Sequence, residues 1–210
     1  MPSSLDSLAT QQLLAGIATD GYAIIKNFMP AASITSLADE ITALHLSGEM
    51  RRAGTGKVLA PTDDSIRGDF ILWLENTSVS ASQQAYFAQM EIMRTSLNRD
   101  FYLGLFELES HFALYPPGAL YRKHLDQFQG QEQRQISCIL YLNQDWQPEH
   151  GGQLRMYLDG IAHEPYRDIE PIAGTLVAFL SGRFFHEVLP ATHERVSLTG
   201  WFSTRSDRLQ

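Results

Sequence analysis

The sequence predicts an α+β fold in which helices pack on one face of a sandwich or jelly roll of short strands. Helical periodicity of apolar residues fills the first half of the chain, whereas from Glu107 onward short apolar runs are separated by Gly- and Pro-containing turns. At 210 residues with 44% hydrophobic residues, the chain is long enough to bury the core of one domain. We therefore expect a single domain over residues 1–210, with helical support in 1–106 and the strand core in 107–203.

Three amphipathic helices are expected before the strand core. Apolar residues recur at helical spacing over residues 5–17, again after Pro30, and again after Ser80, which can cap the third helix. Gly21 and Gly48 are placed to end the first two helices. Two strands are expected between the helices, at residues 22–28 and 70–74.

The second half of the chain has the alternation and turn residues of a strand-rich core. Glycine pairs, Asp-Gly and Pro-Pro-Gly punctuate the apolar runs. The expected strands are residues 108–115, 121–126, 136–143, 153–158, 175–181 and 195–203.

Residues 49–66 show neither helical nor strand periodicity and are locally basic, with Arg51, Arg52 and Lys57 in an acidic protein. A loop of this length in a compact domain is usually either functional or disordered. The sequence leaves both interpretations open at this point.

Composition excludes several classes of protein. A net charge of −8 argues against nucleic acid as a partner. The single cysteine, Cys138, rules out an internal disulfide and a cysteine-based zinc site, which favours the reducing cytoplasm. The first residues lack a basic segment and an apolar stretch, so no signal peptide is expected. The apolar runs are far shorter than the roughly 20 residues of a membrane helix, so no membrane association is expected.

The pattern His124-x-Asp126 stands out as a candidate metal site. On a strand, residues i and i+2 share a face, so both side chains would project together. A histidine and an aspartate separated by one residue also occur by chance in chains of ordinary composition. The order of a later histidine, His186, on another strand, followed by Arg195, raises its significance. Two imidazoles and one carboxylate suit an iron(II) that keeps open positions, and Arg195 can clamp a carboxylate with two hydrogen bonds.

The last strand has one apolar face and one unusual face. The unusual face carries a cation, hydroxyls and an indole: Arg195, Ser197, Thr199, Trp201 and Ser203. A half-exposed strand with its polar face in water explains this alternation, and so does a barrel whose interior receives an anionic ligand. An indole on the polar face favours the barrel.

Several further segments, in order along residues 51–203, resemble one known family. They are Ile66-Arg-Gly-Asp69, the run from Cys138 to Asn143 with Asp145-Trp146, Gly151-Gly-Gln-Leu-Arg155, Asp168-Ile-Glu-Pro171 and His186-Glu-Val-Leu-Pro190. Together with the ligand pattern they resemble the iron(II)- and 2-oxoglutarate-dependent dioxygenases, and within them the prolyl 4-hydroxylases related to the animal oxygen-sensing hydroxylases.

The resemblance implies a double-stranded β-helix that binds Fe(II), 2-oxoglutarate and O2, with ascorbate as an optional reductant. Its metal ligands would be His124, Asp126 and His186. The residues implied for 2-oxoglutarate and the adjoining wall are Arg195, Tyr141, Thr199, Tyr115 and Trp201.

The resemblance also implies hydroxylation of a prolyl residue at the 4-position, with release of succinate and CO2. The basic loop would cover a protein substrate, for which a translation component such as elongation factor Tu is the leading candidate. The implied substrate-binding residues are Arg67, Arg51, Arg52, Lys57 and Tyr121. Hydroxylation of free proline or another small molecule, and a non-catalytic iron-binding sensor, are the alternatives.

Overall fold

The computed structural model describes residues 4–54, 63–75, 79–127, 132–159 and 164–205. Three α-helices occur in this part of the chain: α1 (Ser4–Thr19), α2 (Ala31–Leu46) and α3 (Ala81–Phe101). None of the helices in these ranges is long and apolar enough to cross a membrane.

Apolar periodicity underlies α2, and a side-chain cap begins α3. On α2, the buried residues Ile34, Leu37 and Ile41 are spaced to fall on one face. The hydroxyl of Ser80 caps α3 by accepting a hydrogen bond from the Gln83 backbone N–H at 3.2 Å. All three expected helices are therefore present.

Seven strands form the larger sheet, in which every described pairing is antiparallel. In spatial order they are β1 (Tyr22–Ile25), β9 (Leu176–Leu180), β6 (Arg134–Tyr141), β11 (Arg195–Thr204), β4 (Leu105–Tyr115), β3 (Phe70–Trp73) and β2 (Arg51–Arg52).

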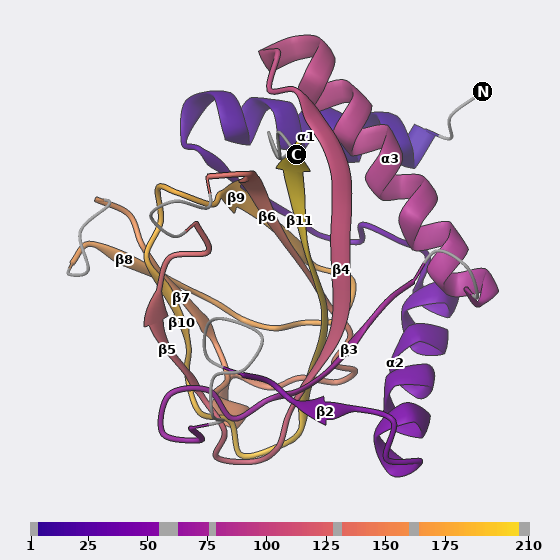
Figure 1. The fold of residues 1–210 in the computed structure, drawn as a ribbon, viewed down its shortest axis with the longest axis vertical. Coiled ribbons are helices and arrows are strands. Elements are labelled where there is room, and N and C mark those ends of the chain that lie inside the picture. The colour runs from indigo at the N-terminus through magenta and orange to yellow at the C-terminus, as the bar shows by residue number, and fades with distance from the viewer. Residues whose placement is uncertain (1–3, 55–62, 76–78, 128–131, 160–163, 206–210) are drawn as a thin grey trace, which may run out of the picture.

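A four-stranded antiparallel sheet faces the larger one. Its order is β5 (Tyr121–His124), β10 (His186–Val188), β7 (Leu154–Tyr157) and β8 (Tyr166–Ile169). From β4 to β11 the chain passes repeatedly from one sheet to the other, which is the winding of a jelly roll. Figure 1 shows the two sheets opposite each other and the helices on the outer side of the larger sheet. The predicted double-stranded β-helix with supporting helices is confirmed.

Alternating side chains give the larger sheet two apolar faces and the protein two core clusters. On β4, Phe112 and Leu114 pack toward the helices, whereas Ala113 and Tyr115 belong to the cluster between the sheets. The polar face of β11 lies on the inner side, where Arg195 is 1% and Trp201 6% exposed. The barrel interpretation of this strand is therefore correct, and the half-exposed one is wrong.

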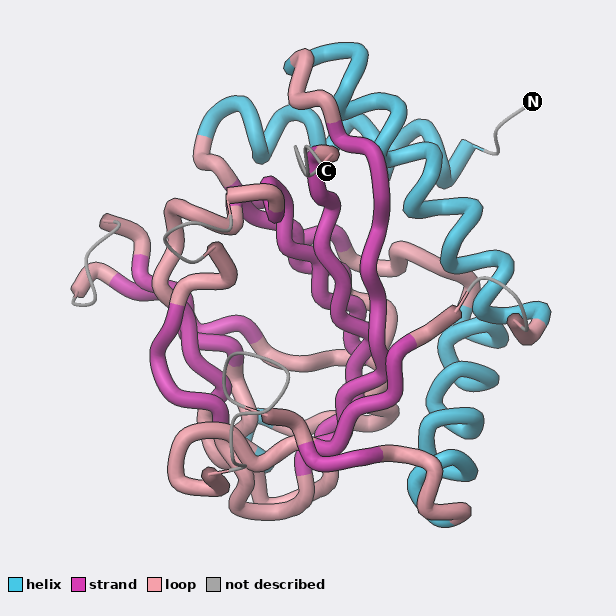
Figure 2. The backbone as a smooth tube through the Cα atoms, in the orientation of Figure 1, coloured by secondary structure: helices cyan, strands magenta, loops and turns pink. Residues whose placement is uncertain are grey.

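The structure corrects several element boundaries. The strand expected over residues 121–126 ends at His124, so Asp126 lies in a bend beyond it. The loop expected over 49–66 begins as strand β2, which pairs with β3, as the tube in Figure 2 also shows. Strand β8 was not predicted from the sequence at all.

Candidate functional site: a His-Asp-His metal centre

Two neighbouring strands of the smaller sheet bring the predicted ligands together. His124 ends β5 and His186 begins β10, and these two residues pair directly across the strands. The bend after β5 turns Asp126 toward both rings, so that the three ligand atoms lie within 4.8 Å of one another. The His124 Nε2 atom is 3.5 Å from Asp126 Oδ1, and the His186 Nε2 atom is 3.6 Å from Asp126 Oδ2.

Backbone carbonyls fix the orientation of both imidazoles. The Nδ1 atom of His124 lies 2.7 Å from the Arg122 carbonyl oxygen, and that of His186 lies 3.1 Å from the Phe184 carbonyl oxygen. A carbonyl only accepts hydrogen bonds, so each Nδ1 carries the proton and each Nε2 presents a lone pair. Both lone pairs and the carboxylate converge, which is the donor set that iron(II) accepts in a facial triad.

A hydroxyl chain supports the carboxylate. Ser137 donates a hydrogen bond to Asp126 Oδ2 at 2.6 Å and lies 2.8 Å from the Ser181 hydroxyl. Burial raises the pKa of Asp126, but its electrostatic interaction with His186, its interactions with His124 and the hydrogen bond that Ser137 donates outweigh burial and lower that pKa. Asp126 is thus held as an anion and available to a cation.

Burial and the neighbouring His124 lower the pKa of His186 to about 4. The ring of His186 packs edge-on against Phe179, with 4.9 Å between ring centroids. His186 is therefore neutral at physiological pH, which is the state that binds metals.

A second set of unsatisfied groups lies on the larger sheet. Arg195 donates from Nε to the Gly152 carbonyl oxygen at 2.9 Å, but its buried Nη2 has no partner among the described residues. The buried Tyr141 hydroxyl also lacks one in that part of the chain, and burial raises the pKa of Tyr141 to about 12. The Arg195 guanidinium lies 5.1 Å from the ring centroids of both Tyr115 and Tyr141. A buried cation without an anion is costly, so this part of the inner wall fits a ligand carboxylate.

Comparison with known proteins agrees with this geometry. The profile of the 2OG-Fe(II) oxygenase superfamily matches residues 110–203. The crystal structure of a Pseudomonas putida prolyl-4-hydroxylase is 44% identical, covers 92% of this chain and 98% of its own, and has a TM-score of 0.85. This chain belongs to the prolyl hydroxylase branch of the 2OG-Fe(II) oxygenase superfamily.

More distant members of the branch support the assignment. Egl nine homolog 1 of Homo sapiens is 30% identical over 96% of this chain, and the chain spans 48% of that protein. A Trichoplax adhaerens prolyl hydroxylase, solved with a peptide fragment of the hypoxia inducible factor oxygen degradation domain, is 25% identical with a TM-score of 0.82, over 95% of this chain and 90% of that one. The predicted requirement for Fe(II), 2-oxoglutarate and O2 is that of the superfamily and is confirmed. The role of ascorbate stays a prediction.

The structure places the predicted 2-oxoglutarate residues on one wall. Tyr115 lies directly opposite Arg195 in the β4–β11 register. Thr199 lies on the same face of β11, half-buried, and makes no hydrogen bond to Arg195 within the described residues. Trp201 is two residues further on and lies opposite Ser137, the residue that donates a hydrogen bond to Asp126. The individual roles of these residues stay predictions.

The predicted substrate-binding residues are distributed differently. Arg67 forms two hydrogen bonds, of 2.7 and 2.9 Å, to the fully buried Asp69, and its guanidinium lies over the ring of Tyr121. Tyr121 in turn stacks on His124, with ring centroids 3.7 Å apart. Tyr121 therefore packs directly against the predicted ligand His124, and Arg67 packs against Tyr121. These contacts exist independently of any contact with substrate.

The basic loop is only partly described. Arg51 and Arg52 form the exposed edge strand β2, and Arg52 pairs with Asp64. Lys57 lies outside the described residues. Substrate binding by these three residues stays a prediction.

Sequence inspection missed two residues that support the site, Ser137 and Ser181. Each is a fully buried serine in or beside an otherwise apolar strand, β6 or β9. A serine at an inward position of a predicted buried strand could have drawn attention to them, because buried hydroxyls need partners.

Proposed function

We propose that this protein is an iron(II)- and 2-oxoglutarate-dependent prolyl 4-hydroxylase that acts on a protein substrate. The observation that carries the proposal is the convergence of His124, Asp126 and His186 in a prolyl hydroxylase fold whose inner wall also holds Arg195, with a buried Nη2 that has no partner among the described residues. The 44% identity to a bacterial prolyl-4-hydroxylase over nearly the whole of both chains supports the substrate type.

In this proposal, each part of the chain has a defined task. The two Nε2 atoms and the Asp126 carboxylate hold the iron, and the Nδ1–H donors keep both rings in place. Arg195 and Tyr141 donate hydrogen bonds to the distal carboxylate of 2-oxoglutarate and fix its orientation. With O2, the bound iron and 2-oxoglutarate supply an oxidant that hydroxylates an unactivated C–H bond, and succinate and CO2 are released. The buried aromatic wall excludes water.

The substrate that we propose is a prolyl residue in a translation component, with elongation factor Tu as the leading candidate. Strand β2 is the edge strand of the larger sheet, next to β3, and its two exposed arginines offer a basic docking surface. The lone cysteine is buried and unpaired, which suits an enzyme of the reducing cytoplasm.

A lysate experiment tests this function. The purified protein is incubated with Fe(II), 2-oxoglutarate and a bacterial cell lysate, and tryptic peptides are searched for prolyl residues that gain one oxygen atom. We expect one or a few such sites with the wild type, and none with Asp126→Ala as the matched control.

Two results would contradict the proposal. Oxidised free proline without any oxidised prolyl peptide would favour the small-molecule alternative. Iron binding with no succinate formed, even with lysate present, would favour the non-catalytic sensor.

A further inference from the structure

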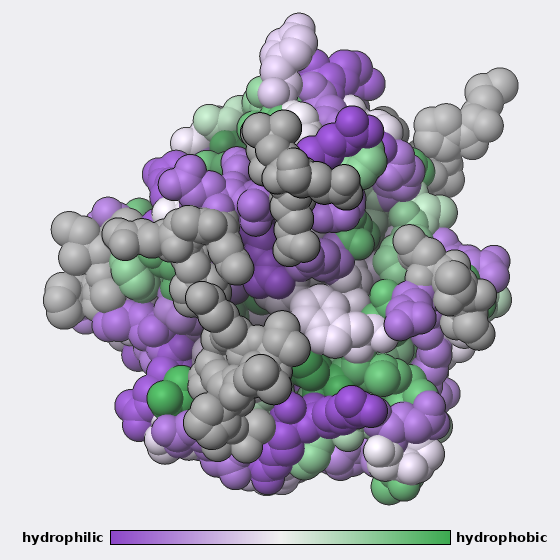
Figure 3. Space-filling model, in the orientation of Figure 1, coloured by the Kyte–Doolittle hydropathy of each residue, from purple (hydrophilic) through white to green (hydrophobic). Residues whose placement is uncertain are grey.

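The bend that carries the predicted ligand Asp126 is not held by strand pairing. The pairing of β5 with β10 ends at His124 and His186, and Asp126 lies two residues beyond it. Strand β5 borders the opening between the two sheets, and hydrophilic side chains surround much of that opening in Figure 3. Directed hydrogen bonds from neighbouring segments must therefore fix the position of this bend.

The side chain of Gln127, the residue after the ligand, makes such contacts. Its amide nitrogen donates hydrogen bonds to the Glu132 carbonyl oxygen at 3.0 Å and to the Arg134 carbonyl oxygen at 3.2 Å. Because carbonyl oxygens only accept, these two bonds identify the amide nitrogen and leave the amide oxygen on the other side. Arg134 begins β6, the strand from which Ser137 donates to Asp126. The amide of Gln127 thus ties the bend to the strand that orients the carboxylate.

The amide oxygen of Gln127 lies against Gly182, in the turn between β9 and β10. A Cβ atom built on Gly182 would overlap that oxygen, and its three nearest atoms all belong to the Gln127 side chain. Gly182 does not have a positive φ, so its backbone conformation does not require glycine. The close approach of Gln127 therefore explains why a residue without a side chain occupies this position.

The same turn supports two of the predicted ligands. The Ser181 hydroxyl lies 2.8 Å from the hydroxyl of Ser137, which donates to Asp126. The Phe184 carbonyl oxygen orients the ring of His186. The contact between Gln127 and this turn therefore adds a second link between the segments that carry the carboxylate and the imidazole.

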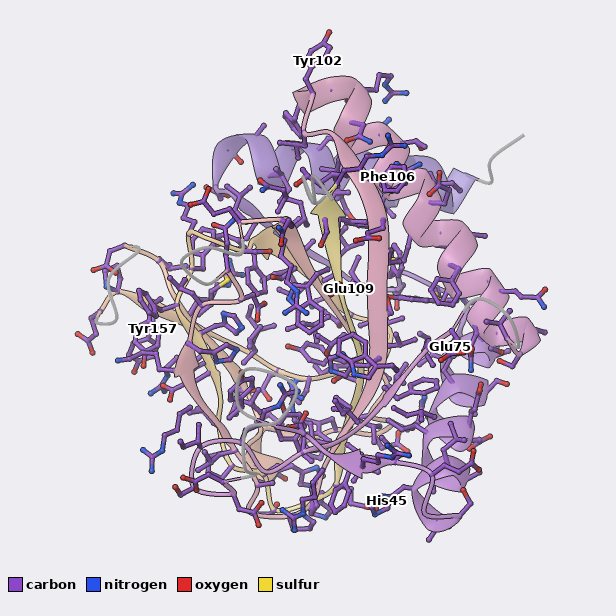
Figure 4. The ribbon with its side chains drawn as sticks, in the orientation of Figure 1. His45, Glu75, Tyr102, Phe106, Glu109 and Tyr157 are labelled. Carbon is purple, nitrogen blue, oxygen red and sulfur yellow. The ribbon has the colours of Figure 1, made fainter. Side chains whose placement is uncertain are left out.

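Backbone hydrogen bonds anchor the turn on both sheets. The Ser181 N–H donates to the Gln135 carbonyl oxygen on β6 at 3.0 Å. The Phe185 carbonyl oxygen accepts from the backbone N–H of Tyr157 at 2.9 Å, and Figure 4 shows Tyr157 on β7 of the smaller sheet. A turn held at both ends is a fixed surface, so the side chain packed on it has a defined position.

We propose that Gln127 is a positioning residue of the metal site, which ties the bend carrying Asp126 to β6 and to the turn after β9, and that Gly182 is required because it leaves room for the Gln127 amide. The inference rests on the proposed function, since it concerns the metal site of that enzyme. Without the amide, the bend is free to move Asp126 away from His124 and His186. Metal affinity should then fall by about tenfold or more, as for other groups that orient metal ligands.

The test uses manganese(II) alone as the probe, and its dissociation constant is measured from the EPR signal of the free ion. Gln127→Met keeps the length of the side chain and removes both hydrogen-bond donors. Gly182→Ala keeps the amide but displaces it with one methyl group. Gln135→Ala is the matched control, because the Gln135 amide donates to the same Glu132 carbonyl oxygen from within β6.

We expect Gln127→Met and Gly182→Ala each to raise the manganese(II) dissociation constant by about tenfold or more, and Gln135→Ala to leave it unchanged. The EPR line shape of the bound ion depends on the arrangement of its ligands, so it should change in the first two variants only. A purely structural role would instead lower the unfolding free energy of the metal-free protein and leave this line shape unchanged, which would overturn the inference.

A double variant tests whether Gly182 acts through Gln127. In a Gln127→Ala background the added methyl group at Gly182 meets no glutamine side chain, so Gly182→Ala should have no further effect on manganese(II) binding. An equal effect of Gly182→Ala in this background and in the wild type would overturn the inference, as would wild-type affinity in Gln127→Met. In both cases the proposed function stands. If the wild type itself binds no manganese(II), the metal assignment fails, and the proposed function fails with it.

Discussion

At the scale of single residues, each predicted metal ligand is held by one other group of the chain. Backbone carbonyls orient the two histidines, and the Ser137 hydroxyl orients Asp126. Ligand orientation by such outer groups typically contributes tenfold to hundredfold in metal affinity. The ligands themselves have no substitute, since no other histidine, cysteine or acidic residue in the described chain joins their cluster.

We therefore predict that His124→Ala, Asp126→Ala and His186→Ala each abolish tight iron binding and 2-oxoglutarate turnover. Ser137→Ala should weaken iron binding by about tenfold to hundredfold, because the carboxylate loses its orienting donor. Titration of iron(II) under anaerobic conditions measures both effects. Turnover retained in two of the three alanine variants would contradict the metal assignment.

Arg195 is predicted to affect the cosubstrate and leave the metal in place. Arg195→Ala should raise the KM for 2-oxoglutarate by a hundredfold or more, since an unpaired buried carboxylate costs about 3–5 kcal/mol. Arg195→Lys should recover part of the loss, because it restores the charge without the two-pronged geometry. Iron affinity measured on the same variants is the control, and an unchanged KM in Arg195→Ala would refute the role.

His111 should make folding stability depend on pH. Burial lowers the pKa of His111 in the folded state to about 3, whereas in the unfolded state it is about 6.5. Below pH 6.5 the unfolded state therefore binds a proton that the folded state does not bind. Its contribution is fully present above pH 6.5 and is lost as the pH falls toward 3, by about 2 kcal/mol between pH 7 and pH 5. Urea unfolding of the wild type and His111→Phe at both pH values measures it. The variant should lose less stability on acidification by that amount; equal losses would contradict the prediction.

At the scale of elements, a short segment pairs with the strand that carries His124, β5. Residues 66–68 bond to β5 and its preceding residue, through Gly68 N–H to the Leu120 carbonyl and Arg122 N–H to the Ile66 carbonyl. The Arg67–Asp69 pair locks this segment, and Arg67 lies over Tyr121, which stacks on His124. The Arg67–Asp69 ion pair is therefore linked to the predicted ligand His124 through the ring of Tyr121.

Breaking this pair should cost far more than breaking an exposed one. Asp69→Ala leaves the largely buried Arg67 without its anion, and we expect a loss of about 3–5 kcal/mol of unfolding free energy. Asp64→Ala, which removes the partner of Arg52 on the exposed β2, should cost less than about 1 kcal/mol. Denaturant unfolding of both variants makes the comparison. Similar losses of unfolding free energy in the two variants would show that the Arg67–Asp69 pair stabilises the fold no more than an exposed pair does.

The long elements were predictable from the sequence, whereas the short ones were not. The α2 stripe and the alternation of β11 are long enough for periodicity to show. Strand β8 has three exposed residues and one buried, so it carries no alternation, and the two-residue β2 exists only by pairing with β3. His124 and Asp126 were expected on one strand face, but β5 stops first. The three predicted ligands still converge because the bend after β5 turns Asp126 toward both histidines, which no local pattern encodes.

At the scale of the whole molecule, the candidate site joins the two sheets. The histidine ligands come from the smaller sheet, whereas Arg195 and Tyr141 project from the larger one. Asp126 already connects the two through Ser137 on β6. A metal with bound 2-oxoglutarate would therefore contact both walls of the jelly roll, and its binding energy would favour the closed barrel over the unfolded chain.

Metal and cosubstrate should accordingly raise the melting temperature in two separable steps. A ligand at a hundred times its Kd stabilises the folded state by about 2.7 kcal/mol, which corresponds to roughly 5–10 °C for a chain of this size. Manganese(II), as a redox-inert substitute, should give the first increment and 2-oxoglutarate a second. Asp126→Ala should lose both, because the metal site is broken. Arg195→Ala should keep the first and lose most of the second, because the metal ligands are intact and the carboxylate partner is missing. Differential scanning calorimetry with and without a chelator measures these shifts; a full 2-oxoglutarate increment in Arg195→Ala, or any metal increment in Asp126→Ala, would contradict a site shared between the two sheets.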